Sequence, residues 1–121
     1  MKIGDFIQSG DFKGEKHVPV ITAPAAAKAG EPINVGLCVG AEIAHPNTLE
    51  HYIAWIKLYF KPAKTRFLIE LGELDFRRPG ELCALPNGSL SVTLKESGTL
   101  IAVSYCNIHG LWESSAEITV E

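Results

Sequence analysis

The chain has 121 residues, of which 46% are apolar and 21% are charged, and its formal net charge at pH 7 is −3. A chain of this length and composition is expected to fold as a single globular domain over residues 1–121, with a core large enough to need no disulfides. The slight negative charge gives no general reason to expect nucleic acid or an anionic membrane as a partner.

The N-terminus and the cysteines indicate the compartment. Residues 1–8 lack the apolar run of a signal peptide, and no stretch approaches the roughly 20 apolar residues of a membrane span. We therefore expect a cytoplasmic protein. The three cysteines, Cys38, Cys83 and Cys106, are an odd number, which disfavours a disulfide framework and favours thiol chemistry or metal binding for at least one of them.

The first part of the chain predicts extended segments. Residues 15–21 are typical of a strand, and Pro19 places that strand at a sheet edge or bulge. Residues 23–30 are too short for a stable helix and predict a loop or a continuing edge strand. Residues 33–40 alternate between apolar and small or polar types, which indicates a half-buried strand with Cys38 pointing away from the apolar face.

A stiff turn and a longer strand follow. His45 precedes a proline, which favours an extended backbone, and Asn47 with Glu50 resembles a capping box for one short helical turn. Every second residue from 52 to 60 is apolar, so this segment predicts a strand with one continuous core face. His51 lies on the opposite, only partly polar face.

The second half of the chain completes an all-β pattern. Residues 66–76 predict a strand with a bulge near Gly72, and turn residues on either side of 81–85 frame a loop that contains Cys83. Three further strands are expected at 89–95, 99–105 and 114–120, with residues 96–98 as a hairpin turn between the first two. About seven short strands without a convincing helix favour a β-sandwich or small barrel.

The segment Cys106-Asn107-Ile108-His109 places a thiol and an imidazole three residues apart. Such a pair is only half of a tetrahedral zinc site. The other histidines each lie in a turn-like or strand-edge context. These other histidines are His17, His45 and His51. If they and His109 converged on Cys106, four imidazoles and one thiolate would be too many ligands for a four-coordinate zinc site and the wrong ligand types for calcium or magnesium. The same set would suit an iron ion with one open coordination position.

The residues alone leave other interpretations open. Each histidine could instead be an ordinary polar side chain. An electron-transfer cupredoxin is also a β-sandwich and binds copper through two histidines, a cysteine and often a methionine, although Met1 is the only methionine here. A metal-free immunoglobulin-like binding module would use the face that carries Trp55 as its partner surface.

Three blocks of sequence carry a resemblance to a known family. Residues 15–21 (EKHVPVI), residues 45–56 (HPNTLEHYIAWI) and residues 106–112 (CNIHGLW) resemble, in order, the signature blocks of the superoxide reductases. The resemblance extends over nearly the whole chain and includes every histidine. The chain has no cysteine-rich, desulforedoxin-like domain, so it resembles the one-iron neelaredoxins within the desulfoferrodoxin family.

This resemblance implies an oxidoreductase with one mononuclear, non-haem iron per chain on an immunoglobulin-like β-fold. The ferrous form would reduce superoxide to hydrogen peroxide without releasing dioxygen, and the ferric form would be the resting state. The electron donor implied is a rubredoxin, and the assembly implied is a homodimer or homotetramer. The implied iron ligands are four histidines in a plane, His17, His45, His51 and His109, with Cys106 axial.

The resemblance also assigns roles to residues around the iron. Glu15 would bind the oxidised iron, and a carboxylate suits this role because a hard ligand prefers ferric over ferrous iron. Lys16 would attract the superoxide anion and help to protonate the peroxide through water. Backbone N–H groups of Ile108 and His109 would donate to the cysteine sulfur, and Gly110 would permit the tight turn that brings them there.

Overall fold

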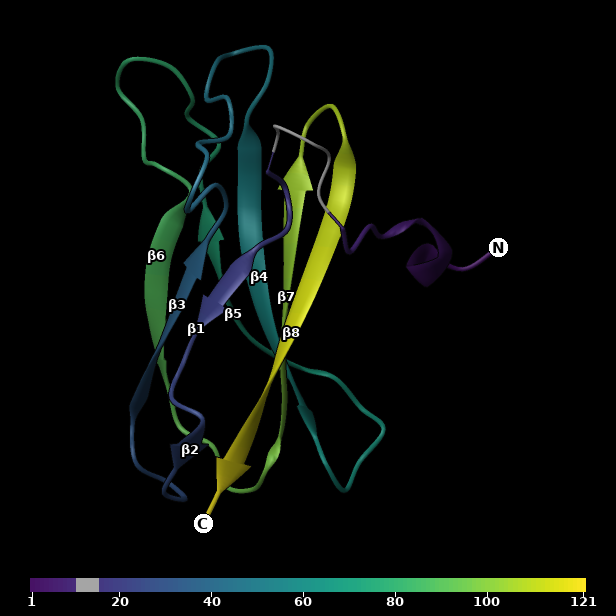
Figure 1. The fold of residues 1–121 in the computed structure, drawn as a ribbon, viewed down its shortest axis with the longest axis vertical. Coiled ribbons are helices and arrows are strands. Elements are labelled where there is room, and N and C mark those ends of the chain that lie inside the picture. Colours follow the sequence, from purple (N-terminus) through teal and green to yellow (C-terminus); the bar gives the residue numbers. More distant parts are fainter. Residues whose placement is uncertain (11–15) are drawn as a thin grey trace.

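The computed structural model describes residues 1–10 and 16–121, and these residues form two β-sheets that face each other (Figure 1). One sheet has three strands in the order β1-β3-β6, and the other has five in the order β2-β8-β7-β4-β5. The predicted all-β class is confirmed, with eight strands in the described residues where about seven were expected. The elements are η1 (Ile3–Phe6, a 3-10 turn), β1 (Val20–Thr22), β2 (Ala26–Ala27), β3 (Ile33–Cys38), β4 (Ile53–Pro62), β5 (Ile69–Asp75), β6 (Asn87–Val92), β7 (Gly98–Cys106) and β8 (Gly110–Val120).

The hydrophobic core lies between the two sheets and follows the predicted alternation. The three-stranded sheet contributes Val35 and Leu37 of β3 to this core, and the five-stranded sheet contributes Ile56, Leu58 and Phe60 of β4. Full burial of each such side chain contributes about 1.5–3 kcal/mol. The core faces predicted for residues 33–40 and 52–60 are therefore confirmed, and they fix the orientation of the two strands that lead to the predicted metal ligands.

The edge predictions are also confirmed, with shorter strands than expected. β1 begins at Val20, after residues 16–19, and it lies at the edge of the three-stranded sheet. β2 is a two-residue edge strand within the segment 23–30. The bulge expected near Gly72 is present, because Leu58 pairs with Gly72 whereas Tyr59 pairs with Glu70.

The predicted hairpin turn at residues 96–98 is wrong. β6 pairs with β3 in the small sheet, whereas β7 pairs with β4 and β8 in the large sheet, so residues 93–97 cross from one sheet to the other. Turn-forming residues show that the chain changes direction but do not specify the partner of the next strand. The hairpin partner of β7 is β8, through residues 107–109.

The predicted helical turn after His45 is wrong as well. Residues 47–51 contain no helix; instead Thr48 and His51 exchange backbone hydrogen bonds in both directions, at 2.9 and 3.3 Å. The Asn47 side chain does not cap a helix, because its Nδ2 donates to Cys83 Sγ at 3.1 Å. A tertiary contact with the loop between β5 and β6 thus replaces the local interaction that the sequence suggested.

Three connections meet at one end of the molecule, opposite the C-terminus (Figure 1). They are the segment before β1, the loop between β3 and β4, and the turn between β7 and β8. Gly40 adopts a φ of 82° in the second of these connections, and a Cβ at Gly40 would lie 2.7 Å from the backbone nitrogen of His45. The glycine therefore lets this loop fold back tightly where a histidine follows.

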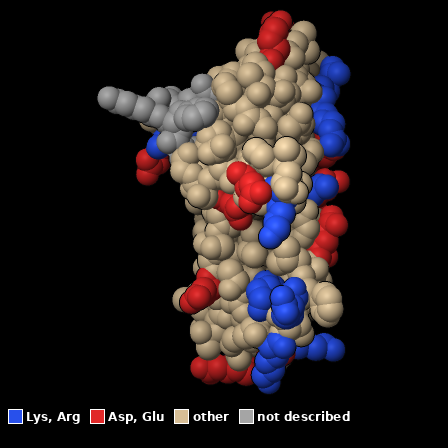
Figure 2. Space-filling view, turned by 90° about the vertical axis from the view of Figure 1, so that its right-hand side faces the viewer, with Lys and Arg blue, Asp and Glu red and all other residues tan. Residues whose placement is uncertain are grey.

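The surface has no broad field of one charge on the face shown in Figure 2, where acidic and basic side chains are interspersed. This agrees with the small net charge of −3. Across residues 1–10 and 16–121, no helix is long and apolar enough to span a membrane.

Candidate metal centre

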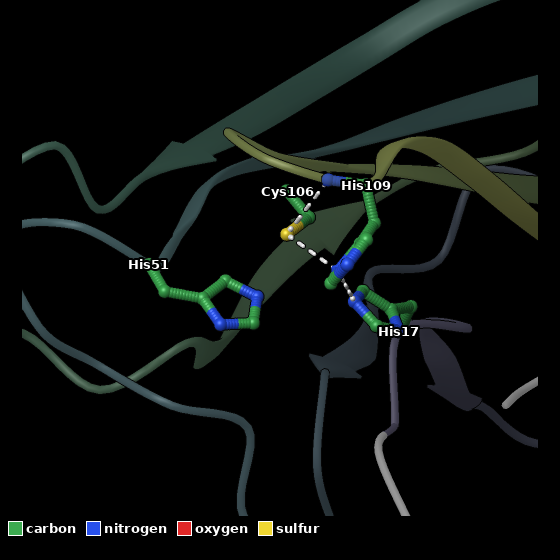
Figure 3. Close-up of side chains that lie close together, drawn as sticks. All are labelled: His17, His51, Cys106 and His109. Atoms are coloured by element: carbon green, nitrogen blue, oxygen red, sulfur yellow. Dashed lines mark hydrogen bonds between the residues drawn. The ribbon is translucent and has the colours of Figure 1, made fainter. Parts of the chain in front are cut away.

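Three imidazoles and one thiol converge at this end of the fold (Figure 3). Their ligand atoms all lie within 4.8 Å of one another, and they come from the segment before β1, the loop before β4, the end of β7 and the turn before β8. Burial decreases across the cluster, from two fully buried residues through a half-buried one to an exposed one. In that order the residues are His17, Cys106, His51 and His109.

The spacing of these donors fits a shared ion. His17 Nε2 lies 3.1 Å from His109 Nδ1. Two nitrogen donors at about 2.1 Å from one ion and at right angles to each other lie roughly 3.0 Å apart. The Cys106 sulfur is 3.9 Å from the same His109 nitrogen, so it is close enough to join them with a small adjustment. A mixed set of imidazoles and one thiolate suits a transition metal rather than calcium or magnesium.

His45 lies beside this cluster rather than within it. Its ring centroid is 4.7 Å from that of His17 and 4.6 Å from that of His51, and its side chain is buried. His45 Nδ1 donates to the carbonyl oxygen of Pro46 at 2.7 Å. Because Nδ1 then carries the proton, Nε2 keeps the lone pair that a metal ligand needs. All four predicted histidines and the predicted cysteine are thus neighbours in space.

The turn after β7 shapes the surroundings of the sulfur. The backbone N–H of His109 donates to Cys106 Sγ at 3.4 Å, as the sequence predicted. The second predicted donor, the N–H of Ile108, makes no such bond among the residues that the structure describes. Gly110 has a φ of 82°, which favours glycine and confirms its place in the tight turn.

The two residues predicted to act beside the metal have different outcomes. Lys16 is half-buried and lines a surface cavity of about 280 Å³ together with Gly40 and Glu42. It directly precedes His17 in the sequence. Glu15 lies outside the described residues, so its role stays a prediction.

Sequence reasoning missed two residues that hold His17. The buried Ser104 hydroxyl donates to the His17 carbonyl oxygen at 2.7 Å. The Trp112 ring is fully buried and stacks on the His17 ring, with centroids 4.5 Å apart, and its Nε1 donates to the His109 carbonyl oxygen at 3.2 Å. Trp112 was visible only as part of the third sequence block, and nothing local indicated that it would contact a histidine 95 positions away.

The other cysteines lie outside the donor cluster. Cys38 and Cys83 are both free thiols of intermediate exposure. Burial raises the pKa of the Cys38 thiol above its ordinary value, which favours the protonated thiol over the thiolate. Cys83 accepts the hydrogen bond from Asn47 and so connects the loop between β5 and β6 to the segment that carries His45.

Comparison with known proteins gives a consistent picture. The family model described as Desulfoferrodoxin matches residues 9–115. A neelaredoxin from Megalodesulfovibrio gigas is 42% identical, with 100% of both chains covered, and a superoxide reductase from Pyrococcus abyssi is 47% identical, with 94% of this chain and 96% of that protein covered. The solved structure of a superoxide reductase (neelaredoxin) from Ignicoccus hospitalis superposes with a TM-score of 0.90 at 41% identity, covering 100% of each chain.

Proposed function

The chain belongs to the desulfoferrodoxin family, and from that membership and its donor cluster we propose that it reduces superoxide to hydrogen peroxide at one mononuclear iron. It is an enzyme of the superoxide reductase class. The observation that supports this function most is the convergence of three imidazoles and one thiol within 4.8 Å, with His45 beside them. Neither a tetrahedral zinc site nor a copper site with two histidines requires this many donors.

The protein would hold the iron through four imidazoles and one thiolate. When bound, ferrous iron would supply the single electron that, together with two protons, converts superoxide into hydrogen peroxide. The Cys106 thiolate contributes negative charge and a polarizable donor, and the N–H of His109 moderates that charge through the bond to sulfur. The ligands are His17, His45, His51, Cys106 and His109.

Two charged residues would serve the open side of the site. Lys16 would draw the superoxide anion towards the cluster and pass protons to the product through water. Glu15 would bind the ferric state and leave when the iron is reduced, because a hard carboxylate prefers the ferric ion. The position of Lys16, directly before His17 in sequence and on the wall of a surface cavity, supports the first role.

The remaining parts of the proposal concern the whole molecule. Residues 1–121 would form one iron-binding domain with a single iron per chain. A rubredoxin would supply the electron that returns the iron to its ferrous form, and the chain would act in the cytoplasm as a homodimer or homotetramer. The immunoglobulin-like sandwich would then serve as the scaffold for three loops that bring the ligands together.

Metal content and product yield test the proposal together. Protein purified without added metal should contain close to one iron per chain, and the anaerobically reduced protein should form one hydrogen peroxide for each superoxide consumed. A yield of one peroxide for every two superoxide ions, with dioxygen released, would instead identify a dismutase. Copper in place of iron would favour an electron-transfer protein.

Replacing Lys16 with glutamine is expected to slow the reaction with superoxide by about three- to tenfold at low ionic strength. The reason is the loss of a positive charge from the residue that precedes the proposed ligand His17 in the sequence. The effect should shrink as salt screens the charge, so the variant should show a flatter dependence of rate on ionic strength. Pulse radiolysis at several salt concentrations measures both quantities.

Lys28 provides the matched control, because it lies beyond β2 at the opposite end of the molecule from the cluster. Lys28→Gln removes the same charge and should leave the rate and its salt dependence close to those of the unmodified protein. Equal effects of the two substitutions would show that only net charge matters, and the local role of Lys16 would then be wrong.

A further inference from the structure

Asn107 makes three hydrogen bonds with one short segment of the chain, although it is 55 positions away in sequence. Its backbone N–H donates to the Tyr52 carbonyl oxygen at 3.2 Å, and its side-chain Oδ1 accepts from the Tyr52 N–H at 2.9 Å. Its side-chain Nδ2 donates to the Glu50 carbonyl oxygen at 3.0 Å. The bonds therefore lie on both sides of His51.

These bonds continue a β-ladder beyond its end. β4 and β7 pair as far as Ile53 and Cys106, after which the chain of β7 turns away into residues 107–109. The side-chain amide of Asn107 has the donor and the acceptor of a peptide group, so it can take the place of the missing backbone partner for residues 50–52.

We infer that Asn107 is a positioning residue that fixes His51 relative to Cys106 and His109. It is attached by its own backbone between these two residues and by its side chain to the residues on either side of His51. If one metal ion binds all three residues, Asn107 therefore sets the distance between the loop that carries His51 and the turn that carries Cys106 and His109. This inference rests on the proposed function for the statement that the three residues bind iron.

Iron affinity measured by competition with a chelator tests the inference without reference to superoxide. Asn107→Leu has a similar shape and removes both side-chain hydrogen bonds, and we expect about a 10- to 100-fold loss of ferrous iron affinity, as is typical when a partner that orients a ligand is removed. Asn107→Asp keeps an acceptor for the Tyr52 N–H and loses the donor to Glu50, so its loss should be smaller. Asn34→Leu on β3, an exposed position, is the matched control and should lose none.

A double-mutant cycle with His51→Ala shows whether Asn107 acts through His51. If it does, Asn107→Leu should cost no further affinity once His51 is alanine, because the ligand that it positions is gone. The same loss in both backgrounds would overturn the inference and indicate an independent contribution to folding. All of these outcomes can be read from iron affinity, so they remain valid whether or not the protein produces peroxide.

Hydrogen exchange of the iron-loaded protein gives a second readout. The peptide that contains Tyr52 should exchange faster in Asn107→Leu, while peptides from β7 should keep their protection, which shows that the fold persists. If β7 also loses protection in Asn107→Leu, the fold itself is disturbed and Asn107→Asp becomes the test variant. Slow exchange at Tyr52 together with reduced iron affinity in Asn107→Asp would support the inference. Unchanged iron affinity in a folded Asn107→Leu protein would rule it out.

Discussion

Replacing Cys106 with serine is expected to abolish the absorption band that arises from charge transfer between the cysteine sulfur and ferric iron. Cys106 is the sulfur donor of the cluster and is fully buried at the end of β7. A serine hydroxyl is a hard donor with a much higher pKa than a thiol, so it stays protonated and donates little electron density. We expect the rate of superoxide reduction to fall on the order of 100-fold, which corresponds to a barrier increase of about 2.7 kcal/mol.

The other two cysteines provide the controls for this prediction. Cys38→Ser and Cys83→Ser make the same atomic change outside the donor cluster, and both variants should keep the charge-transfer band and one iron per chain. The visible spectrum of the ferric protein and its iron content are the measurements. A Cys106→Ser protein that keeps the band would show that its sulfur does not bind the iron.

The sequence predicted the parts of the fold that depend on local alternation. The core faces of β3 and β4 were found because each strand alternates with period two, and burial on one face requires only that pattern. The partner of β7 was not found, because the turn residues at 96–98 are compatible with a hairpin or with a crossing between sheets. Pairing is decided by contacts between strands that are far apart in sequence, which single residues do not specify.

In the candidate site, the metal donors could be predicted from the sequence and the residues that support them could not. The five donors were identifiable because histidine and cysteine are few in this chain and lie in three recognisable blocks. The supporting residues Ser104, Asn107 and Trp112 were not identifiable, because the role of each depends on a contact with a residue far away in the sequence. Ser104 and His17 are 87 positions apart, and only the folded chain shows that a buried hydroxyl holds the backbone of this predicted ligand.

The same reasoning explains the error at Asn47. A side-chain amide three residues before a glutamate is typical of a helix N-terminus. The structure instead uses the amide to contact Cys83, in the loop between β5 and β6. The loop that contains Cys83 thus supports the segment of His45, and no local pattern predicts a contact between these two loops.

Replacing Trp112 with alanine is expected to lower the free energy of unfolding by about 3–5 kcal/mol and to weaken iron binding. The ring is fully buried, so its removal leaves a large cavity directly against the ring of the predicted ligand His17. The loss of the Nε1 bond to the His109 carbonyl oxygen frees the turn that carries a second predicted ligand. Urea unfolding of the iron-loaded and chelator-treated protein measures both effects.

Two further variants separate packing from the hydrogen bond. Trp112→Phe keeps an aromatic ring against His17 and loses the N–H, so it should retain most of the stability, with about 1 kcal/mol attributable to the missing bond. Trp55→Ala removes the same side chain from a half-buried position on β4 and should cost less than Trp112→Ala. If iron binds the folded state as proposed, a weakened site should also reduce the difference in stability between iron-loaded and iron-free protein. If that difference is the same in Trp112→Ala as in the unmodified chain, the tryptophan supports the core alone and does not hold the ligands.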